Sequence, residues 1–440
     1  MRQRSVGIVG GGLLGMTVAL RLSQQGIRVS LFERAPDLGG LAASVDFAGR
    51  PVDRFYHVIL PSDDRVLGLA DELGLRDEFR FRPTRVGCYG DGKLFSATST
   101  MDFLRFPLLP LHHRLRLGLF AVRSNLIKDF EQLDETPLVQ WLERISGRAV
   151  TERFWKPMLD SKFDGKFDDL PATYIWARSR RMSSTRDKQG REVMGWLYGG
   201  YQRLVDRLEE RIRALGGEIH PNTAVDRIVA GGEGTAGIVV GGELRRFDYV
   251  VSTLMPPQAA ALLEPHLASH AGADRFRYLG VSCLLLRLRR SLSPFYHLNI
   301  PDRSVSLTTI VETTHVVDPE QVGGHLVYVT RYVDPEKADA VHSQDALHAE
   351  LLENARKIFP SLSDELIVDS LVQRARITEP VHLLGGARNV PDMFPVAGLA
   401  LASIANVYPE MSSGQATIGV ADRVASGILE RLPSQVHLAA

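Results

Sequence analysis

The sequence has few cysteines and no excess of charge. Its 440 residues include only Cys88 and Cys283, which form no C-x-x-C pair and have no histidine cluster near them. Neither a disulfide framework nor a structural metal site is therefore expected. The 52 basic residues are balanced by 52 acidic ones. Because no net positive field attracts a polyanion, nucleic acid is not an expected partner, and any phosphate site must arise from local charge.

Long apolar runs are also missing. No run approaches the ~20 residues that a membrane-spanning helix needs, so we expect no such helix. A strand-like run already begins at residue 5, which leaves no room for a signal peptide, and a cytoplasmic location is expected. With 44% hydrophobic residues, the chain can bury large cores and suits one two-lobed unit or two to three domains.

The most informative motif lies at the start of the chain. A β-branched run over residues 6–9 is followed by Gly10, Gly12 and Gly15 in G-x-G-x-x-G spacing, and an apolar period of 3.6 then continues to Gly26. This order predicts a strand, a tight turn and a helix whose N-terminus binds a pyrophosphate. The residues expected to hold that group are Gly10, Gly12, Leu13, Leu14 and Gly15.

A second predicted strand, over residues 28–32, is followed directly by Glu33 and Arg34. Glu33 lies about twenty residues after the glycines, where a carboxylate can accept hydrogen bonds from the hydroxyls of an adenosine ribose. The glycine spacing alone would be weak support, because Gly232, Gly234 and Gly237 repeat it. Those three lie between two strand-like runs without a helix, so we expect them in a hairpin turn.

Gly39, Gly40, Leu41 and Ser44 form a second fingerprint six residues beyond Glu33. In this respect the chain resembles FAD enzymes of the superfamily that contains flavin amine oxidases, protoporphyrinogen oxidases, phytoene desaturases and UDP-galactopyranose mutases. The resemblance implies FAD as the cofactor, with Gly39, Gly40 and Leu41 beside its diphosphate and ribityl chain. No cysteine lies between residues 380 and 415, so a thioether-linked flavin is not expected and the FAD is expected to be non-covalent.

The resemblance also implies the fold. We expect an α/β protein with a Rossmann-like FAD-binding domain of the glutathione reductase and amine oxidase type, discontinuous in sequence and formed by residues 1–85, 196–274 and 386–432. An inserted α+β substrate domain would contain residues 86–195 and 275–385, leaving 433–440 as a disordered tail. Strand-like runs at 281–288, 306–312 and 325–332 and an amphipathic pattern at 345–359 fit a mixed sheet with helices.

Two later segments match parts of the superfamily that contact FAD. Val225, after a strand turn, would pack its backbone on the adenine. A helix predicted from residue 416 is preceded by Ser412, Ser413 and Gly414, and either serine can cap it. By resemblance, the N-terminus of this helix faces the pyrimidine end of the flavin and stabilises negative charge there.

His57 is the only candidate for a catalytic side chain. It matches approximately the position at which the mutases carry a histidine against the flavin. An equally weighted interpretation is a histidine that holds a backbone carbonyl beside the cofactor, because a single histidine is not a catalytic signature.

Two basic segments allow two interpretations each. Residues 101–127 are apolar with interleaved arginines and one acid, Asp102. One interpretation is a segment that lies on a membrane or guards the entrance for a lipophilic substrate. The favoured interpretation is a helical lid whose apolar stripe belongs to the hydrophobic core. Residues 176–191 include Arg178 and Arg181 and could clamp a substrate phosphate; a solvated basic loop is the favoured default. Tyr408 is a further candidate for substrate contact.

The leading functional hypothesis is an FAD-dependent oxidoreductase, either an oxidase, a dehydrogenase or a desaturase, resembling the protoporphyrinogen oxidase branch. It would pass a hydride from a bulky or lipophilic small molecule to flavin N5. The alternative is a redox-neutral mutase of a phosphate-bearing sugar. Amine oxidation is disfavoured, because residues 280–286 offer leucine where the amine oxidases carry a lysine.

Overall fold

The computed structural model describes residues 3–99, 101–102, 105, 109–187, 191–232, 235–339 and 343–432. The predicted tail 433–440 lies outside the described residues, as do Lys188 and Gly234.

A five-stranded parallel sheet forms the first lobe, with β1 at its centre. Residues 6–9 of β1 pair with 249–252 on one side, and residues 5–9 pair with 28–32 on the other. The strand order is β19 (Leu399–Leu401), β13 (Tyr249–Ser252), β1 (Ser5–Val9), β2 (Arg28–Phe32) and β9 (Glu218–His220). Because all five strands run in one direction, their carboxyl ends meet at the same edge, which is where such sheets bind ligands.

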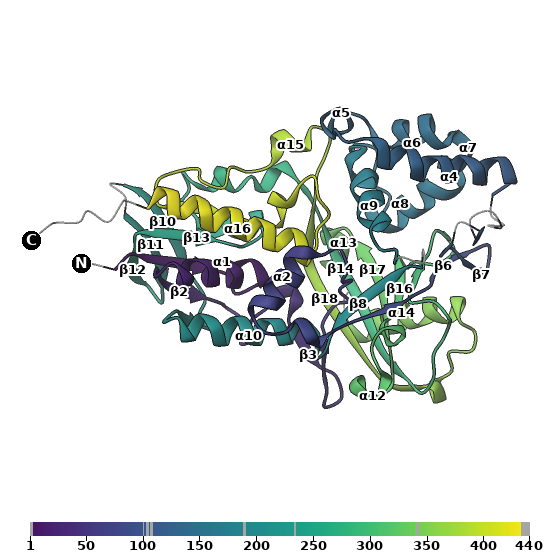
Figure 1. Cartoon of the computed structure of the whole chain (residues 1–440), viewed down its shortest axis with the longest axis horizontal. Coiled ribbons are helices and arrows are strands. Elements are labelled where there is room, and N and C mark those ends of the chain that lie inside the picture. The colour runs from purple at the N-terminus through teal and green to yellow at the C-terminus, as the bar shows by residue number, and fades with distance from the viewer. Residues whose placement is uncertain are drawn as a thin grey trace, which may run out of the picture.

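Helices cover one face of this sheet. Their apolar side chains share one core with Ile8 and Leu31, and the helices are α1 (Leu13–Gln24), α2 (Asp64–Glu72), α10 (Gly200–Ala214) and α16 (Gly414–Arg431). Figure 1 shows α1 and α16 side by side, and Arg21 Nε of α1 is 2.8 Å from Asp422 Oδ1 of α16. Segments from the two ends of the described chain therefore share one layer.

An antiparallel three-stranded sheet covers the opposite face. It contains β10 (Arg227–Gly232), β11 (Thr235–Val240) and β12 (Glu243–Phe247). Ile228, Ile238 and Phe247 pack there against Val9 and Phe32. The predicted hairpin forms, since β10 and β11 pair, but Gly232 and Gly237 lie within these strands rather than in the turn.

A mixed seven-stranded sheet organises the second lobe. Its order is β18 (Ile367–Val381), β14 (Arg277–Leu288), β17 (His325–Val333), β16 (Thr309–Glu312), β15 (His297–Asn299), β6 (Val86–Gly90) and β7 (Lys93–Ser96). Leu284 and Leu286 of β14 pack on one face with α14 (Gln344–Ile358). Cys283 and Leu285 pack on the other with residues that follow the hairpin of β3 (Ser44–Asp46) and β4 (Pro51–Asp53). This second face carries the site described below.

A group of helices lies beside this sheet and away from α1 (Figure 1). They share a core around Trp141, Leu142 and Trp176. The group contains α4 (Leu111–Leu126), α5 (Glu131–Asp134), α6 (Leu138–Ser146), α7 (Arg148–Val150), a π-helical turn (Thr151–Trp155), α8 (Lys156–Phe163) and α9 (Thr173–Ser183). The smaller elements are β5 (Phe79–Pro83), β8 (Val193–Leu197), α11 (Pro256–Leu262), α12 (Pro319–Val322), α13 (Pro335–Asp339) and α15 (Gly386–Asn389).

The predicted α/β class with a mixed second sheet is confirmed. The solvated loop favoured for residues 176–191 is wrong for its first half, because α9 continues to residue 183 and buries Trp176 in the helical core. In the part of the chain that the structure describes, no helix combines the length and the apolar character needed to cross a membrane.

Candidate active site

The two glycine fingerprints meet at the carboxyl ends of β1 and β2. The Gly39 N–H donates a hydrogen bond to the Gly11 carbonyl oxygen over 2.8 Å, and Gly12 and Gly39 form a parallel bridge. The two loops are thus joined through their backbones. The structure therefore places both predicted diphosphate-binding segments in one site.

Glycine is required where these loops approach other backbone. A Cβ atom at Gly15 would lie 2.0 Å from the Gly10 carbonyl oxygen, so no larger residue fits. Gly40 has a φ of +61°, and a Cβ there would lie 3.3 Å from the Cα of Gly12. At Gly12 itself, among the described residues other than its chain neighbours, only the Gly39 oxygen lies within 4 Å of such a Cβ, at 3.9 Å, so open space remains beside the turn.

Helix α1 begins in this open space. Its first residues, Leu13 and Leu14, are buried, and no side chain caps its N-terminus. The N–H groups of the first turn therefore have no side-chain acceptor and face the turn with the positive end of the helix dipole. This arrangement fits a diphosphate without further rearrangement.

Glu33 lies at the rim of the same turn. Its carboxylate accepts hydrogen bonds from the N–H groups of Gly11 at 2.7 Å and Ala35 at 2.8 Å. The N–H of Thr223 donates to the Glu33 carbonyl oxygen, which ties the loop that contains Val225 to this rim. Val225 is half-buried against the β10–β12 core. Arg34 is exposed, and Leu41 is half-buried in the core below the second sheet.

The N-terminus of α16 forms the other end of the site. Ser413 caps it by accepting a hydrogen bond from the Ala416 N–H at 3.2 Å, so Ser413 rather than Ser412 is the cap. No acidic residue lies in the first turn. Ser412, Ser413 and Gly414 line a cavity between the lobes, and the helix dipole therefore favours negative charge there.

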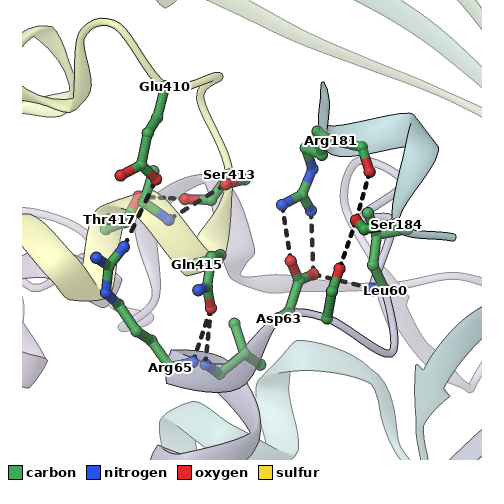
Figure 2. A network of polar contacts seen from close by, with 12 residues as sticks. Leu60, Asp63, Arg65, Arg181, Ser184, Glu410, Ser413, Gln415 and Thr417 are labelled. Atoms are coloured by element: carbon green, nitrogen blue, oxygen red, sulfur yellow. Dashed lines mark hydrogen bonds and ion pairs between the residues drawn. The ribbon is translucent and has the colours of Figure 1, made fainter. Parts of the chain in front are cut away.

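A network of polar contacts fixes α16 to its surroundings (Figure 2). The guanidinium of Arg181 on α9 makes two hydrogen bonds with the Asp63 carboxylate, at 2.7 and 3.0 Å. The Gln415 side-chain oxygen accepts from the Arg65 N–H at 2.8 Å. Because Asp63 and Arg65 lie at the start of α2, three distant segments are braced at one corner of the site. Arg181 lines the cavity, but its charge is satisfied by Asp63.

The cavity beside α16, here called the Arg178 cavity, has a volume of about 270 Å³. Its apolar lining includes Met158, Leu159, Ile175, Met182, Met194 and Ile300. Its polar lining includes Tyr56, His57, Lys162, Tyr174, Arg178, His297, Tyr332 and Glu379. Sequence segments from both lobes therefore contribute to one mixed pocket, which is the usual character of a small-molecule site.

The basic side chains in this cavity differ in whether they have a partner of opposite charge. Lys162 Nζ lies 2.6 Å from Glu379 Oε2 and 3.4 Å from the centroid of the Tyr332 ring. Burial alone would lower the pKa of Lys162, but Glu379 outweighs it and raises that pKa, so the ammonium stays charged. Arg178, by contrast, forms no hydrogen bond or ion pair with any residue that the structure describes. It is therefore the uncompensated cation of the cavity.

Both histidines in the cavity are neutral at pH 7. Burial lowers the pKa of His57 to about 4, and burial together with the charge of Arg178 lowers that of His297 to about 3. The His57 ring packs at 4.8 Å from the ring of Tyr201, and its Nδ1 has no hydrogen-bond partner among the described residues. Its backbone contact with Phe55 fits the interpretation in which this histidine holds a backbone carbonyl beside the cofactor.

A second cavity adjoins the first and shares Tyr56, His57 and Tyr296 with it. This Asp53 cavity has a volume of about 460 Å³. The Asp53 carboxylate accepts a hydrogen bond from the Tyr201 N–H at 2.9 Å, and burial raises its pKa to about 7. Asp53 is therefore a carboxyl group that is half protonated near neutral pH.

Tyr408 lies outside the Arg178 cavity. Its hydroxyl contacts Asp134 and the Thr173 hydroxyl, and it lines a space of about 50 Å³ together with His382. The structure thus brings Arg178, Arg181 and His57 together but leaves Tyr408 apart.

Several residues of the site were not singled out from the sequence, namely Asp53, Tyr56, Lys162, His297 and Glu379. Lys162 and Glu379 are separated by 217 positions, so no local pattern joins them. Among the described residues, no group of three or more His, Cys, Asp or Glu side chains could hold a metal ion.

Residues 15–380 match one protein family, described as flavin-containing amine oxidoreductases. Among curated proteins, 285 aligned residues are 25% identical to the 4,4'-diapolycopen-4-al dehydrogenase of Metabacillus indicus, covering 56% of this chain and 55% of that protein. The chain therefore spans about half the length of this curated relative.

Two solved structures share the fold over nearly the whole chain. An oxidoreductase from Methanosarcina mazei has a TM-score of 0.71 at 22% identity and covers 97% of this chain and 100% of its own. Reduced UDP-galactopyranose mutase has a TM-score of 0.75 at 16% identity, covering 97% and 96%. At such identities the likeness concerns the fold, and it agrees with the architecture predicted from the two fingerprints.

Proposed function

Because the chain belongs to the family of flavin-containing amine oxidoreductases, we propose that it is an FAD-dependent oxidoreductase acting on a bulky, largely apolar small molecule. The family match confirms the superfamily resemblance and the flavin cofactor that the fingerprints implied. Bound FAD supplies the hydride-accepting chemistry, and the protein supplies binding, orientation and electrostatics.

The observation that supports this proposal most directly is the continuity of the site. Residues that fit FAD run from the joined glycine loops to the N-terminus of α16, and the Arg178 cavity opens at that second end. The residues proposed to hold FAD are Gly10, Gly12, Leu13, Leu14, Gly15, Glu33, Arg34, Gly39, Gly40, Leu41, Val225, Ser412, Ser413 and Gly414.

Within the cavity, the side chains would orient the substrate rather than act as a strong general base. His57 and His297 are uncharged but only weakly basic, with pKa values of about 4 and about 3, and Lys162 is held as a charged ammonium by Glu379. The apolar lining would take the body of the substrate, and Arg178 would bind an anionic group on it, since an unpaired guanidinium gains most from a carboxylate or phosphate. Positioning of this kind accounts for much of the rate in such reactions.

The two alternatives have less support from the site. A mutase acting on a diphosphate would need a clamp of several cations, but Arg181 is already satisfied by Asp63, which leaves Arg178 alone. An amine substrate would approach as a cation and would be repelled by Arg178. Strand β14 contains no lysine that could meet an amine substrate.

The first experiment is an absorbance spectrum of the purified protein before and after dithionite, followed by readmission of oxygen. A flavin spectrum that bleaches on reduction is expected, with its rate of return separating an oxidase from a dehydrogenase or desaturase. A protein that takes up no flavin, even after incubation with FAD, would refute the proposal.

The role of Arg178 is tested by titrating the oxidised flavoprotein with oleate and with oleyl alcohol while following the flavin band. Arg178→Gln should weaken oleate binding roughly ten- to a hundredfold and leave the alcohol unaffected, since one charged hydrogen bond contributes about 1.5–3 kcal/mol. Arg180→Gln is the matched control, because Arg180 is exposed on the same helix and does not line this cavity. Equal losses in both variants would contradict the assignment.

A further inference from the structure

Large apolar side chains are exposed mainly in one part of the described chain. Nine such residues are exposed, and six of them lie between positions 101 and 126. Five of the six are on α4, where the exposed fraction ranges from 49% to 73%. They are Leu111, Leu115, Leu119, Val122 and Leu126. This concentration differs from the scattered single residues that are normal on a protein surface.

The five residues form a single stripe, here called the α4 face. At 100° per residue they occupy a sector of about 80° on the helix. Leu117, Phe120 and Ser124, which are buried, lie on the opposite side of the helix. Because α4 already packs through that buried side, the α4 face is not a core stripe of this chain. The lid interpretation, in which the apolar stripe belongs to the core, is therefore wrong for these five residues.

The charged residues on α4 itself are all basic. Arg116 and Arg123 are exposed at its edge, and Lys128 follows directly after the helix. No acidic residue occurs from position 103 to position 128. Long basic side chains beside an apolar stripe can extend toward an anionic layer while the stripe enters an apolar one.

We propose that the α4 face docks on an anionic lipid surface. The apolar stripe would enter the region between headgroups and acyl chains, and Arg116 and Arg123 would reach the lipid phosphates. A second copy of this chain fits less well, because an antiparallel two-fold contact through the same face would bring the arginine edges of the two copies together. The proposal does not depend on the reaction or on the flavin.

The position of α4 gives this surface a connection with the active site. The Ser124 and Ser179 hydroxyls are 2.8 Å apart, and the indole N–H of Trp176 donates to the Ile127 carbonyl oxygen at 3.0 Å. Both contacts join α4 and its end to α9, the helix that carries Arg178. A membrane bound at the α4 face would therefore be separated from the helix that lines the cavity by α4 itself.

The proposal is tested by co-sedimentation of the full chain with vesicles of phosphatidylcholine alone and of phosphatidylcholine mixed with phosphatidylglycerol. The wild type should sediment with the mixed vesicles and less with the neutral ones. Leu115→Glu should lower partition into the mixed vesicles roughly tenfold or more, because a charge replaces an inserted apolar side chain. Leu244→Glu is the matched control, since Leu244 is exposed on β12, and it should bind as the wild type does.

A second variant keeps the test independent of the leucine. Arg116→Gln together with Arg123→Gln should weaken binding to the mixed vesicles roughly thirtyfold, with little change for neutral vesicles, since each basic residue contributes about 1 kcal/mol near an anionic surface. A wild type that sediments with neither vesicle would overturn the proposal. So would a wild-type dimer that Leu115→Glu converts into a monomer, because the face would then join two copies.

Discussion

Asp53 gives the sharpest quantitative prediction. Its carboxylate keeps one hydrogen bond, from the Tyr201 N–H, in a cavity where burial raises the pKa from 3.8 to about 7. The folded protein therefore retains a proton on Asp53 between pH 4 and pH 7, whereas the unfolded chain loses it. Stability contributed by this group is present below pH 4 and falls as pH rises toward the folded pKa.

Asp53→Asn removes this dependence while keeping a side-chain oxygen for the Tyr201 N–H. With these two pKa values, the free energy of unfolding of the wild type falls by about 2.5 kcal/mol between pH 5 and pH 8, and that of the variant does not. This is an upper value, because water in the cavity screens the charge. The variant should therefore gain stability relative to the wild type as the pH rises.

Urea unfolding followed by tryptophan fluorescence at pH 5, 6, 7 and 8 measures this difference. The difference in the free energy of unfolding between variant and wild type should widen toward pH 8 and level off above the pKa of Asp53 in the folded protein. A difference in the free energy of unfolding that stays constant, or that narrows with rising pH, would refute the reasoning. The pKa of Asp53 would then not be raised in the folded protein.

Two further substitutions test other parts of the site. Glu33→Gln should weaken FAD retention several-fold or more, since a charged acceptor of ribose hydroxyls contributes about 1.5–3 kcal/mol. The flavin released on dilution measures this loss. An undiminished affinity for FAD would disprove the role of Glu33 in binding the ribose. Asp63→Asn should destabilise the protein by about 3 kcal/mol, because Arg181 loses its buried counter-ion. A melting curve checks this against Asp64→Asn, an exposed neighbour in the first turn of α2 whose loss should cost less than about 1 kcal/mol.

Local sequence determined the first lobe well. The strand at 28–32 and the helix after the glycines were predictable because their period and their glycines act within a few residues. The fingerprints also identified the edge of the sheet at which ligands bind, since that edge follows directly from parallel strands.

The charges of the cavity were not predictable in the same way. Whether Arg181 is free depends on Asp63, which lies 118 positions before it. Lys162 meets Glu379 only in the folded chain, since the two are 217 positions apart. The apolar residues of 111–126 show a helical period that fits a hydrophobic core and a membrane-binding surface equally well. Only the packing of Leu117 and Phe120 decides which side of the helix is buried.

The shared layer of α1 and α16 has a consequence for how the protein is made. Arg21 and Asp422, which join the two helices, are 401 positions apart. During synthesis, β1 and α1 leave the ribosome early, but the edge strand β19 and the helix α16 that packs on α1 follow only with residues 399–431. The apolar surface of α1 is exposed for nearly all of translation, which is the period when a chaperone is needed. A chain that ends before residue 399 would keep that surface open and should aggregate rather than accumulate as a folded fragment.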